Sequence, residues 1–243
     1  MNTHKRLLEL RTELASVVGL DLIDAPLDRE RFSRDFFEYS PILLKELEGC
    51  LADLVVRPYS LKAISAVSSA CKRYGIPLTL RGAGTGNYGQ CVPLQGGVVM
   101  LMSELCQIRN VNQESGAVTV ESGCLLKDLD KELALHGRQL RLIPSTWRSA
   151  SVGGFFAGGS GGIGSVRWGF LRDPGHLLGL EVVTLEDPAR RLQLGEKDSE
   201  ALNHAYGTNG IITALTLATA PAIAWQEVTI DCGNWPQALE LLH

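Results

Sequence analysis

Glycine is concentrated in two short stretches of this chain, residues 81–97 and 151–169, which hold fourteen of its twenty-six glycines. Glycine inside a helix or strand costs roughly 0.5–1 kcal/mol relative to alanine, so we expect both stretches to be loops. Where no side chain stands in the way, several N–H groups can point inward and form a concavity for an anion. The composition therefore predicts a site at which the backbone closes on a ligand rich in acceptor oxygens, most simply a diphosphate.

The first stretch also matches a dinucleotide-binding fingerprint, but in the wrong context. Residues 84–89 read GTGNYG, which fits G-x-G-x-x-G, and Glu104 follows about twenty residues later. In the Rossmann fold the last glycine opens a helix whose N-terminus carries the pyrophosphate. Here Pro93 and a second strand follow, and the helix precedes the loop. The Rossmann interpretation therefore fails, and so does a P-loop, because no Gly-Lys-Ser/Thr follows.

Short strands and helices are predicted to carry these loops. A helix is expected from Leu61, because apolar residues recur at helical spacing after Ser60, a good N-cap, and Gly75 ends it. A second helix is expected at residues 125–136. Strands are expected at residues 54–57, 78–80, 98–102, 116–121, 140–143 and 211–218, with a hairpin at 179–185 and 190–194.

The order of these elements is mixed, which favours an α+β fold with two packed lobes. Residues 1–50 read as an N-terminal segment of two helical pieces around a break at residues 24–30, and residues 51–222 as the main domain. Residues 223–243 read as the beginning of a further domain, with a strand at 227–231 and a helix from residue 235. Because the chain stops there, we expect that domain to be incomplete or separate.

Charge and composition exclude several classes of protein. A net charge of −4 argues against nucleic-acid binding, which needs a concentrated basic face. A secretory signal peptide needs an uninterrupted apolar core, and charged residues break the N-terminal sequence. No apolar run approaches the ~20 residues of a membrane span. The six cysteines are scattered without a C-x-x-C pair. They are therefore expected to be reduced core residues in a cytoplasmic protein, and no metal site is expected.

Six motifs in order carry a resemblance to a known family. They are VVRPYS, PLTLRGAGTGNYG, AVTVESGCLLKDLDKELALHG, PSTWRSASVGGFFAGGSGG, RDPGHLLGLEVV and GTNGIITALTLATAP, and they run from Ala52 to about Pro221. Together they resemble the PCMH-type FAD-binding domain of the vanillyl-alcohol oxidase and glycolate oxidase flavoprotein family. The resemblance implies mixed and antiparallel sheets, bound FAD, and a C-terminal cap domain that supplies most of the substrate pocket.

The resemblance also implies a set of cofactor-binding residues. The first loop would offer donors to the FAD diphosphate, the second would line the other side of the flavin, and a later strand would bond the adenine or ribose side through its backbone. These residues are Arg81, Gly82, Ala83, Gly84, Thr85, Gly86, Asn87, Ser145, Ser151, Gly153, Gly154, Gly161, Gly162 and Ile211. Two alternatives stay open: Arg81 as a structural arginine under the loop, and glycines that serve only tight turns.

Family members with covalently attached flavin often carry a histidine at the position of Ala83. Alanine cannot attach the ring, so we expect FAD to be held non-covalently.

The favoured hypothesis is an FAD-dependent oxidoreductase, or its FAD-binding portion, that oxidises a small hydroxylated substrate such as a D-2-hydroxy acid by hydride transfer to the flavin. Oxygen, a quinone or a partner subunit would then accept the electrons. The alternative is a non-catalytic flavin-binding subunit or fragment that lacks its substrate domain. A nucleotide-sugar reductase on the same fold has no supporting sequence sign, and the absence of G-x-S-x-G disfavours a serine hydrolase.

No catalytic residue can be assigned from the sequence. Each histidine considered for a catalytic role has a more ordinary interpretation as a helix cap, a loop residue or a solvated residue. Three arginines are suited to holding a substrate carboxylate, since guanidinium matches it bidentately. These candidates are His136, His176, His204, Arg148, Arg167 and Arg172.

Overall fold

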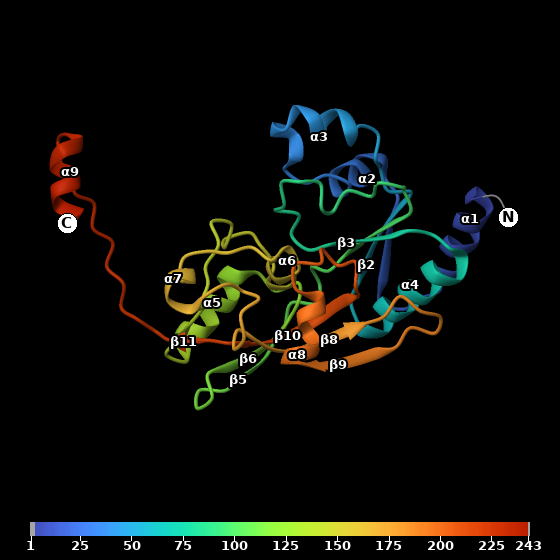
Figure 1. Cartoon of the computed structure of the whole chain (residues 1–243). Coiled ribbons are helices and arrows are strands. Elements are labelled where there is room, and N and C mark those ends of the chain that lie inside the picture. The colour runs from blue at the N-terminus through green and yellow to red at the C-terminus, as the bar shows by residue number, and fades with distance from the viewer. Residues whose placement is uncertain (1–2, 243) are drawn as a thin grey trace.

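Two β-sheets, each with its own hydrophobic core, form the body of the protein (Figure 1). This computed structural model describes residues 3–242. The smaller sheet has the strand order β1-β2-β4-β3, in which β1 is antiparallel to β2 and the other neighbours are parallel. Its strands are β1 (Leu20–Ile23), β2 (Leu54–Pro58), β3 (Leu78–Arg81) and β4 (Val98–Leu101).

The larger sheet is antiparallel throughout and has the order β5-β6-β10-β8-β9. Residues in β6 alternate as predicted, with Val118 and Val120 fully buried and Thr119 half-buried on the other face. Its strands are β5 (Ile108–Val111), β6 (Ala117–Glu121), β8 (Leu177–Val183), β9 (Arg191–Gly195) and β10 (Ile211–Ala218). A separate two-stranded pair joins β7 (Arg138–Gln139) to β11 (Ala220–Pro221).

Helix α4 (Leu61–Tyr74) connects β2 to β3, and its two ends follow the sequence signals. The Ser60 hydroxyl accepts a hydrogen bond from the Ala63 N–H at 3.2 Å, and Gly75 ends the helix with φ +60°. The other helices are α1 (Thr3–Leu14), α2 (Pro26–Phe32), α3 (Pro41–Glu46), α5 (Leu126–Leu135), α6 (Val152–Gly158), α7 (Ser165–Trp168), α8 (Glu196–Ser199) and α9 (Trp235–Leu242), with 3₁₀ turns η1 (Phe37–Tyr39) and η2 (Glu200–Leu202).

The two cores meet where the larger sheet ends. One core packs α5 and α6 on the five-stranded sheet, and the other packs α1 and α4 on the four-stranded sheet. Val183 at the end of β8 and Ile211 at the start of β10 are buried in the second core. The sheets therefore belong to two packed lobes, and the predicted α+β class is confirmed.

The N-terminal segment differs from its prediction. The expected break at residues 24–30 is largely helix α2, which begins with Pro26, because proline fixes a helical φ and its missing N–H is not needed in the first turn. The sequence LDLI also forms a strand, β1, because β2 offers it an edge. Such pairing depends on tertiary context, and a four-residue pattern does not reveal it.

Three further predictions of local structure are wrong. Residues 140–143 form no strand; Ile143 makes only an isolated bridge to Ile163, and the ladder lies at β7 instead. Residues 227–231 also form no strand, because within residues 3–242 they pair with no other strand. The second glycine stretch is not all loop, since it contains α6 and α7. The predicted helix from Trp235 is confirmed as α9, which lies apart from both lobes (Figure 1).

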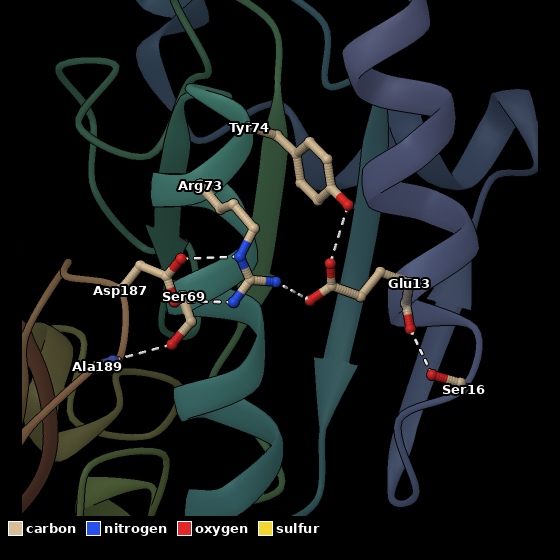
Figure 2. A network of polar contacts seen from close by, with 7 residues as sticks. All are labelled: Glu13, Ser16, Ser69, Arg73, Tyr74, Asp187 and Ala189. Carbon is tan, nitrogen blue, oxygen red and sulfur yellow. Dashed lines mark hydrogen bonds and ion pairs between the residues drawn. The ribbon is translucent and has the colours of Figure 1, made fainter.

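Arg73 on α4 joins three segments that are far apart in the sequence (Figure 2). Its guanidinium donates to both carboxylate oxygens of Asp187, each at 2.8 Å, and to Glu13 on α1 at 2.5 Å. The Tyr74 hydroxyl also donates to Glu13 at 3.0 Å, and the Ala189 N–H donates to Ser69 at 2.9 Å. The network therefore fastens α1 and the β8–β9 connection to the same helix.

We predict that Arg73→Gln loosens α1, because the amide cannot reach two carboxylates at once. Cleavage of native protein by trypsin within α1 should become roughly twofold faster, a small effect because the pairs are partly exposed. Arg34→Gln is the control, since it removes two ion pairs within one local segment, to Glu30 and Glu38. Equal cleavage rates for wild type and both variants would contradict this role of Arg73.

Candidate functional site

A cleft of about 510 Å³ lies where the two lobes face each other, and both glycine stretches line it. The first stretch contributes most of residues 82–91 and the second most of residues 151–161. Residues 144–146 and several residues between 204 and 212 also line the cleft, as do Asp35, Leu80, Met102, Ser122 and Ala150. This volume falls within the ~300–1,000 Å³ of small-molecule and cofactor sites.

Most of the residues implied by the sequence resemblance lie around this cleft. The three that do not are Arg81, Gly162 and Ile211, which lie behind or beside the wall. Those in the wall are Gly82, Ala83, Gly84, Thr85, Gly86, Asn87, Ser145, Ser151, Gly153, Gly154 and Gly161. The fold thus brings together two groups of residues that are separated by more than fifty positions.

The two glycine stretches touch at Gly82. A Cβ on this residue would overlap the Ser151 hydroxyl and would lie 3.5 Å from the Gly154 Cα. A methyl group at Gly82 would therefore displace the Ser151 hydroxyl, which caps α6. In the same loop Gly84 has φ +69°, a conformation that L residues rarely adopt.

Arg81 holds the first loop from behind. Its guanidinium donates to the Arg34 carbonyl at 2.5 Å, to the Phe32 carbonyl at 3.3 Å and to the Cys91 sulfur at 3.1 Å. Phe32 and Arg34 lie outside the cleft wall, whereas Cys91 and Gly84, against which the guanidinium also lies, are part of it. Arg81 therefore lies under the loop, and of the two interpretations left open by the sequence the structure favours the structural one. Burial raises the pKa of the Cys91 thiol to about 11, which keeps this cleft-lining thiol neutral near pH 7.

The N-terminal segment supports the same loop. The Phe36 N–H donates to the Gly86 carbonyl at 2.8 Å. One carboxylate oxygen of Asp35 accepts from the Phe37 N–H at 3.1 Å and from the Gly89 N–H at 3.3 Å. The conformation of the first loop therefore depends on a segment about fifty residues earlier in the chain.

Helix α6 shows why glycine occurs inside a regular element here. The Ser151 hydroxyl caps it by accepting from the Gly154 N–H at 3.2 Å. A Cβ on Gly153 would lie 2.5 Å from the Ser122 Cβ and 2.9 Å from its carbonyl oxygen. The Gly153 N–H donates to that same oxygen at 2.8 Å. Close packing of α6 on the end of β6 thus outweighs the intrinsic cost of glycine in a helix.

Gly162 and Ile211 serve the packing of the fold. A Cβ on Gly162 would collide with the Ile143 carbonyl, which explains the glycine without a ligand. Ile211 is 3% exposed, begins β10, and packs in the core of the smaller lobe. Its neighbours Gly210 and Ile212 line the cleft instead.

The sequence analysis did not identify one pair of cleft residues that have an unusual backbone conformation. His204 and Tyr206 both have positive φ, +55° and +51°, and the His204 Nε2 lies 2.8 Å from the Tyr206 hydroxyl. Such strain in residues other than glycine concentrates at functional sites. His204 is exposed, as expected, but it also lines the cleft. The available signal was the polar NHAY sequence directly before the GTNG motif.

The other candidate residues lie outside the cleft wall. His136 follows α5 as its C-cap and lies 3.2 Å from Glu132, and buried His176 lies 2.7 Å from the Trp168 carbonyl. The arginines stack on aromatic rings at 5.1–5.6 Å. These pairs are Arg148 on Trp147, Arg167 on Trp168 and Arg172 on Phe170.

The model of the FAD binding domain family matches residues 52–188, more than half of the chain. The chain belongs to this family. The match covers the first loop, α6 and the start of the larger sheet, so the resemblance seen in the six motifs is confirmed.

Curated members of this family are similar to the chain over about 70–80% of its length. It is 29% identical over 174 residues to glycolate oxidase subunit GlcD of Escherichia coli K12, covering 69% of the chain and 34% of that protein. It is 31% identical over 175 residues to D-lactate dehydrogenase of Anaerostipes hadrus (70% and 37%) and 27% identical over 205 residues to mitochondrial D-2-hydroxyglutarate dehydrogenase of Danio rerio (81% and 38%). The chain thus spans little more than a third of these proteins.

A solved structure of alkyldihydroxyacetonephosphate synthase is similar in fold. It matches with a TM-score of 0.75 and 22% identity, covering 88% of the chain and 40% of that protein. Among residues 3–242, no helix is long and apolar enough to span a membrane.

We predict that Gly153→Ala lowers the free energy of unfolding by about 1–3 kcal/mol, because its methyl group must displace Ser122 or move α6. Gly158→Ala on the same helix is the matched control. Its methyl group would meet only the Ser160 hydroxyl at 3.7 Å. This variant should be neutral or gain up to about 1 kcal/mol from helix propensity. Urea denaturation measures both, and equal effects would contradict the packing role of Gly153.

Proposed function

We propose that this chain is the FAD-holding part of a flavin-dependent oxidoreductase that acts on a small 2-hydroxy acid. One observation supports it most directly: the two glycine stretches of an FAD-binding family member meet around a single large cleft. When bound, FAD supplies the hydride acceptor. The chain's own residues would hold the cofactor and exclude water.

The cleft wall fits a diphosphate-containing ligand. Residues 82–87 present backbone with little side-chain cover, and at Gly82 a Cβ would fill the space next to Ser151. N–H groups and the Thr85, Asn87, Ser145 and Ser151 side chains are the donors that such a ligand needs. We therefore assign the diphosphate to the first loop and the flavin side to the second.

We propose that FAD is held without a covalent bond. Ala83 lines the cleft at the position where a histidine would attach the ring, and a methyl group cannot do so. The Cys91 thiol in the wall already accepts a hydrogen bond from Arg81 and stays protonated near pH 7.

The substrate class rests on the relatives. Their names refer to glycolate, D-lactate and D-2-hydroxyglutarate, all of which carry a hydroxyl on the carbon next to a carboxylate. A D-2-hydroxy acid is therefore the proposed substrate, with oxygen, a quinone or a partner subunit as electron acceptor. The buried, neutral thiols of Cys71 and Cys124 suit a reducing compartment, and we propose the cytoplasm.

The alternative function is a flavin-binding subunit or fragment without its own substrate domain. We propose that residues 51–222 form the FAD-binding domain, that residues 1–50 support its first loop, and that residues 223–243 begin a further domain. In support, residues 222–232 are almost entirely exposed, and Trp235 on α9 is 71% exposed. An apolar surface of this kind is typical of a segment that packs on another domain.

Gly84→Val should weaken FAD binding at least about tenfold, because the branched side chain is strained at positive φ and would collide with the Arg81 guanidinium. Gly175→Val is the matched control: it has φ +88°, nothing within 4 Å of its Cβ, and lies outside the cleft wall. Fluorescence titration with FAD measures both. Unchanged affinity in the Gly84 variant would show that this loop does not hold the diphosphate.

The visible spectrum of the purified chain, before and after acid precipitation, tests the cofactor assignment. We expect a flavin spectrum whose colour passes into the supernatant; colour in the pellet would contradict non-covalent binding. Anaerobic addition of glycolate, D-lactate or D-2-hydroxyglutarate should then bleach the flavin band. Persistent colour with all three would favour the flavin-binding subunit over the complete oxidoreductase.

A further inference from the structure

Asp35 is a buried acid in the wall of the cleft that neither the family resemblance nor the motifs single out. Its side chain comes from the N-terminal segment, is 8% exposed, and lines the cleft beneath the first glycine loop. One carboxylate oxygen, Oδ1, accepts from the Phe37 and Gly89 N–H groups. The other, Oδ2, is buried and has no hydrogen-bond partner among the residues that the structure describes.

The unpartnered oxygen faces the loop. A methyl group built on Gly86 would lie 3.3 Å from Oδ2, so this atom lies directly behind the backbone that we assign to the diphosphate. The Phe36 N–H bonds the carbonyl of the same glycine at 2.8 Å. Any charge on Asp35 is therefore close to any charge that the loop holds.

Among the described residues, no charged group donates a hydrogen bond to Asp35 Oδ2. The charge of Arg81 on β3 favours the ionised form of Asp35, but its Nη1 donates to two carbonyls and to the Cys91 sulfur. Cys91 itself is a neutral thiol. On the same segment, Arg34 pairs with Glu30 and Glu38 at the surface. The other titratable residues of the cleft wall are Tyr88, His204 and Tyr206.

We infer that FAD binding is coupled to the uptake of a proton by Asp35. A diphosphate brings two negative charges to the loop, and like charges nearby favour the neutral form of a carboxyl group. Burial already raises the pKa of Asp35 in the same direction, although three backbone N–H groups and Arg81 oppose it. Protonation also turns the unpartnered Oδ2 from a hydrogen-bond acceptor into a possible donor. Asp35 is thus a positioning residue that acts on the cofactor through the loop.

The sign of the pH dependence follows from linkage. The complex binds more protons than the free protein, so FAD affinity is highest below the pKa of Asp35 in the free chain. As the pH rises from there toward the pKa in the complex, the affinity falls by up to about tenfold per pH unit. This inference rests on the proposed binding of FAD by the first loop.

Calorimetric titration of the flavin-free chain with FAD, in two buffers of different ionisation enthalpy, counts the protons directly. We expect wild type to take up a fraction of one proton per FAD at pH values between the pKa of Asp35 in the free chain and its pKa in the complex. The Asp35→Asn side chain has the same shape, and its amide oxygen can still accept from the Phe37 and Gly89 N–H groups, but it cannot titrate. This variant should therefore take up no proton on binding FAD, and its FAD affinity should not change with pH. Because the wild-type count needs no variant, the inference is testable even if Asp35→Asn folds poorly.

Two controls separate Asp35 from its neighbours. Glu38→Gln removes an exposed acid of the same segment and should leave the proton count unchanged. His204→Gln removes the histidine of the cleft wall and should leave the proton uptake by Asp35 in place. Two results would overturn this inference but leave the cofactor assignment standing. One is FAD binding by wild type without proton uptake, and the other is proton uptake that persists in Asp35→Asn. A chain that binds no FAD would overturn it together with the cofactor assignment.

Discussion

The close contact between the two glycine stretches is the constraint on which the site depends. Gly82 faces Ser151 with no room for a Cβ, and Gly153 faces Ser122 in the same way. These two contacts bring the first loop, α6 and the end of β6 together, so that backbone from both lobes forms one wall. The Gly82 contact joins the two lobes, whereas the Gly153 contact packs α6 on β6 within the larger lobe. The cleft is therefore a property of how the lobes pack, and neither loop forms it alone.

Support for this wall comes from behind, through residues that do not face the ligand. Arg81 fixes the first loop to the N-terminal segment through the carbonyls of Phe32 and Arg34, and Phe36 returns a hydrogen bond to Gly86. On the far side of the smaller lobe, Arg73 ties α1 and the β8–β9 connection to α4. Residues before Ala52, where the family match begins, thus contribute directly to the geometry of the loop.

The sequence predicted those parts of the fold that local chemistry determines. Ser60 and Gly75 mark the ends of α4 where the structure has them, and the alternation around Val118 and Val120 identifies β6. Apart from α2, which begins at the local signal Pro26, the failures share one cause, dependence on distant residues. Strand β1 exists because β2 pairs with it, and α6 has a glycine at residue 153 because Ser122 lies against it. Residues 227–231 have a strand pattern but no partner strand among residues 3–242.

The same distinction applies to the site. Composition was sufficient to find both walls, because a bare backbone leaves a visible excess of glycine. It could not show that Arg81 lies under the loop and is held by main-chain carbonyls, since these belong to the N-terminal segment. Nor could it reveal Asp35, which enters the wall from a segment with no motif of its own.

The cleft wall described by residues 3–242 contains no lysine or arginine. Arg81, the cation closest to the first loop, is already bound to main-chain oxygens. An anion held there would be solvated mainly by neutral dipoles, with the charge of Arg81 behind the loop. Its affinity would then depend less on ionic strength than the affinity of sites lined by several cationic side chains. Selection among polyanions would rest on shape and hydrogen-bond geometry, which allows an acidic protein to hold a nucleotide without attracting nucleic acid.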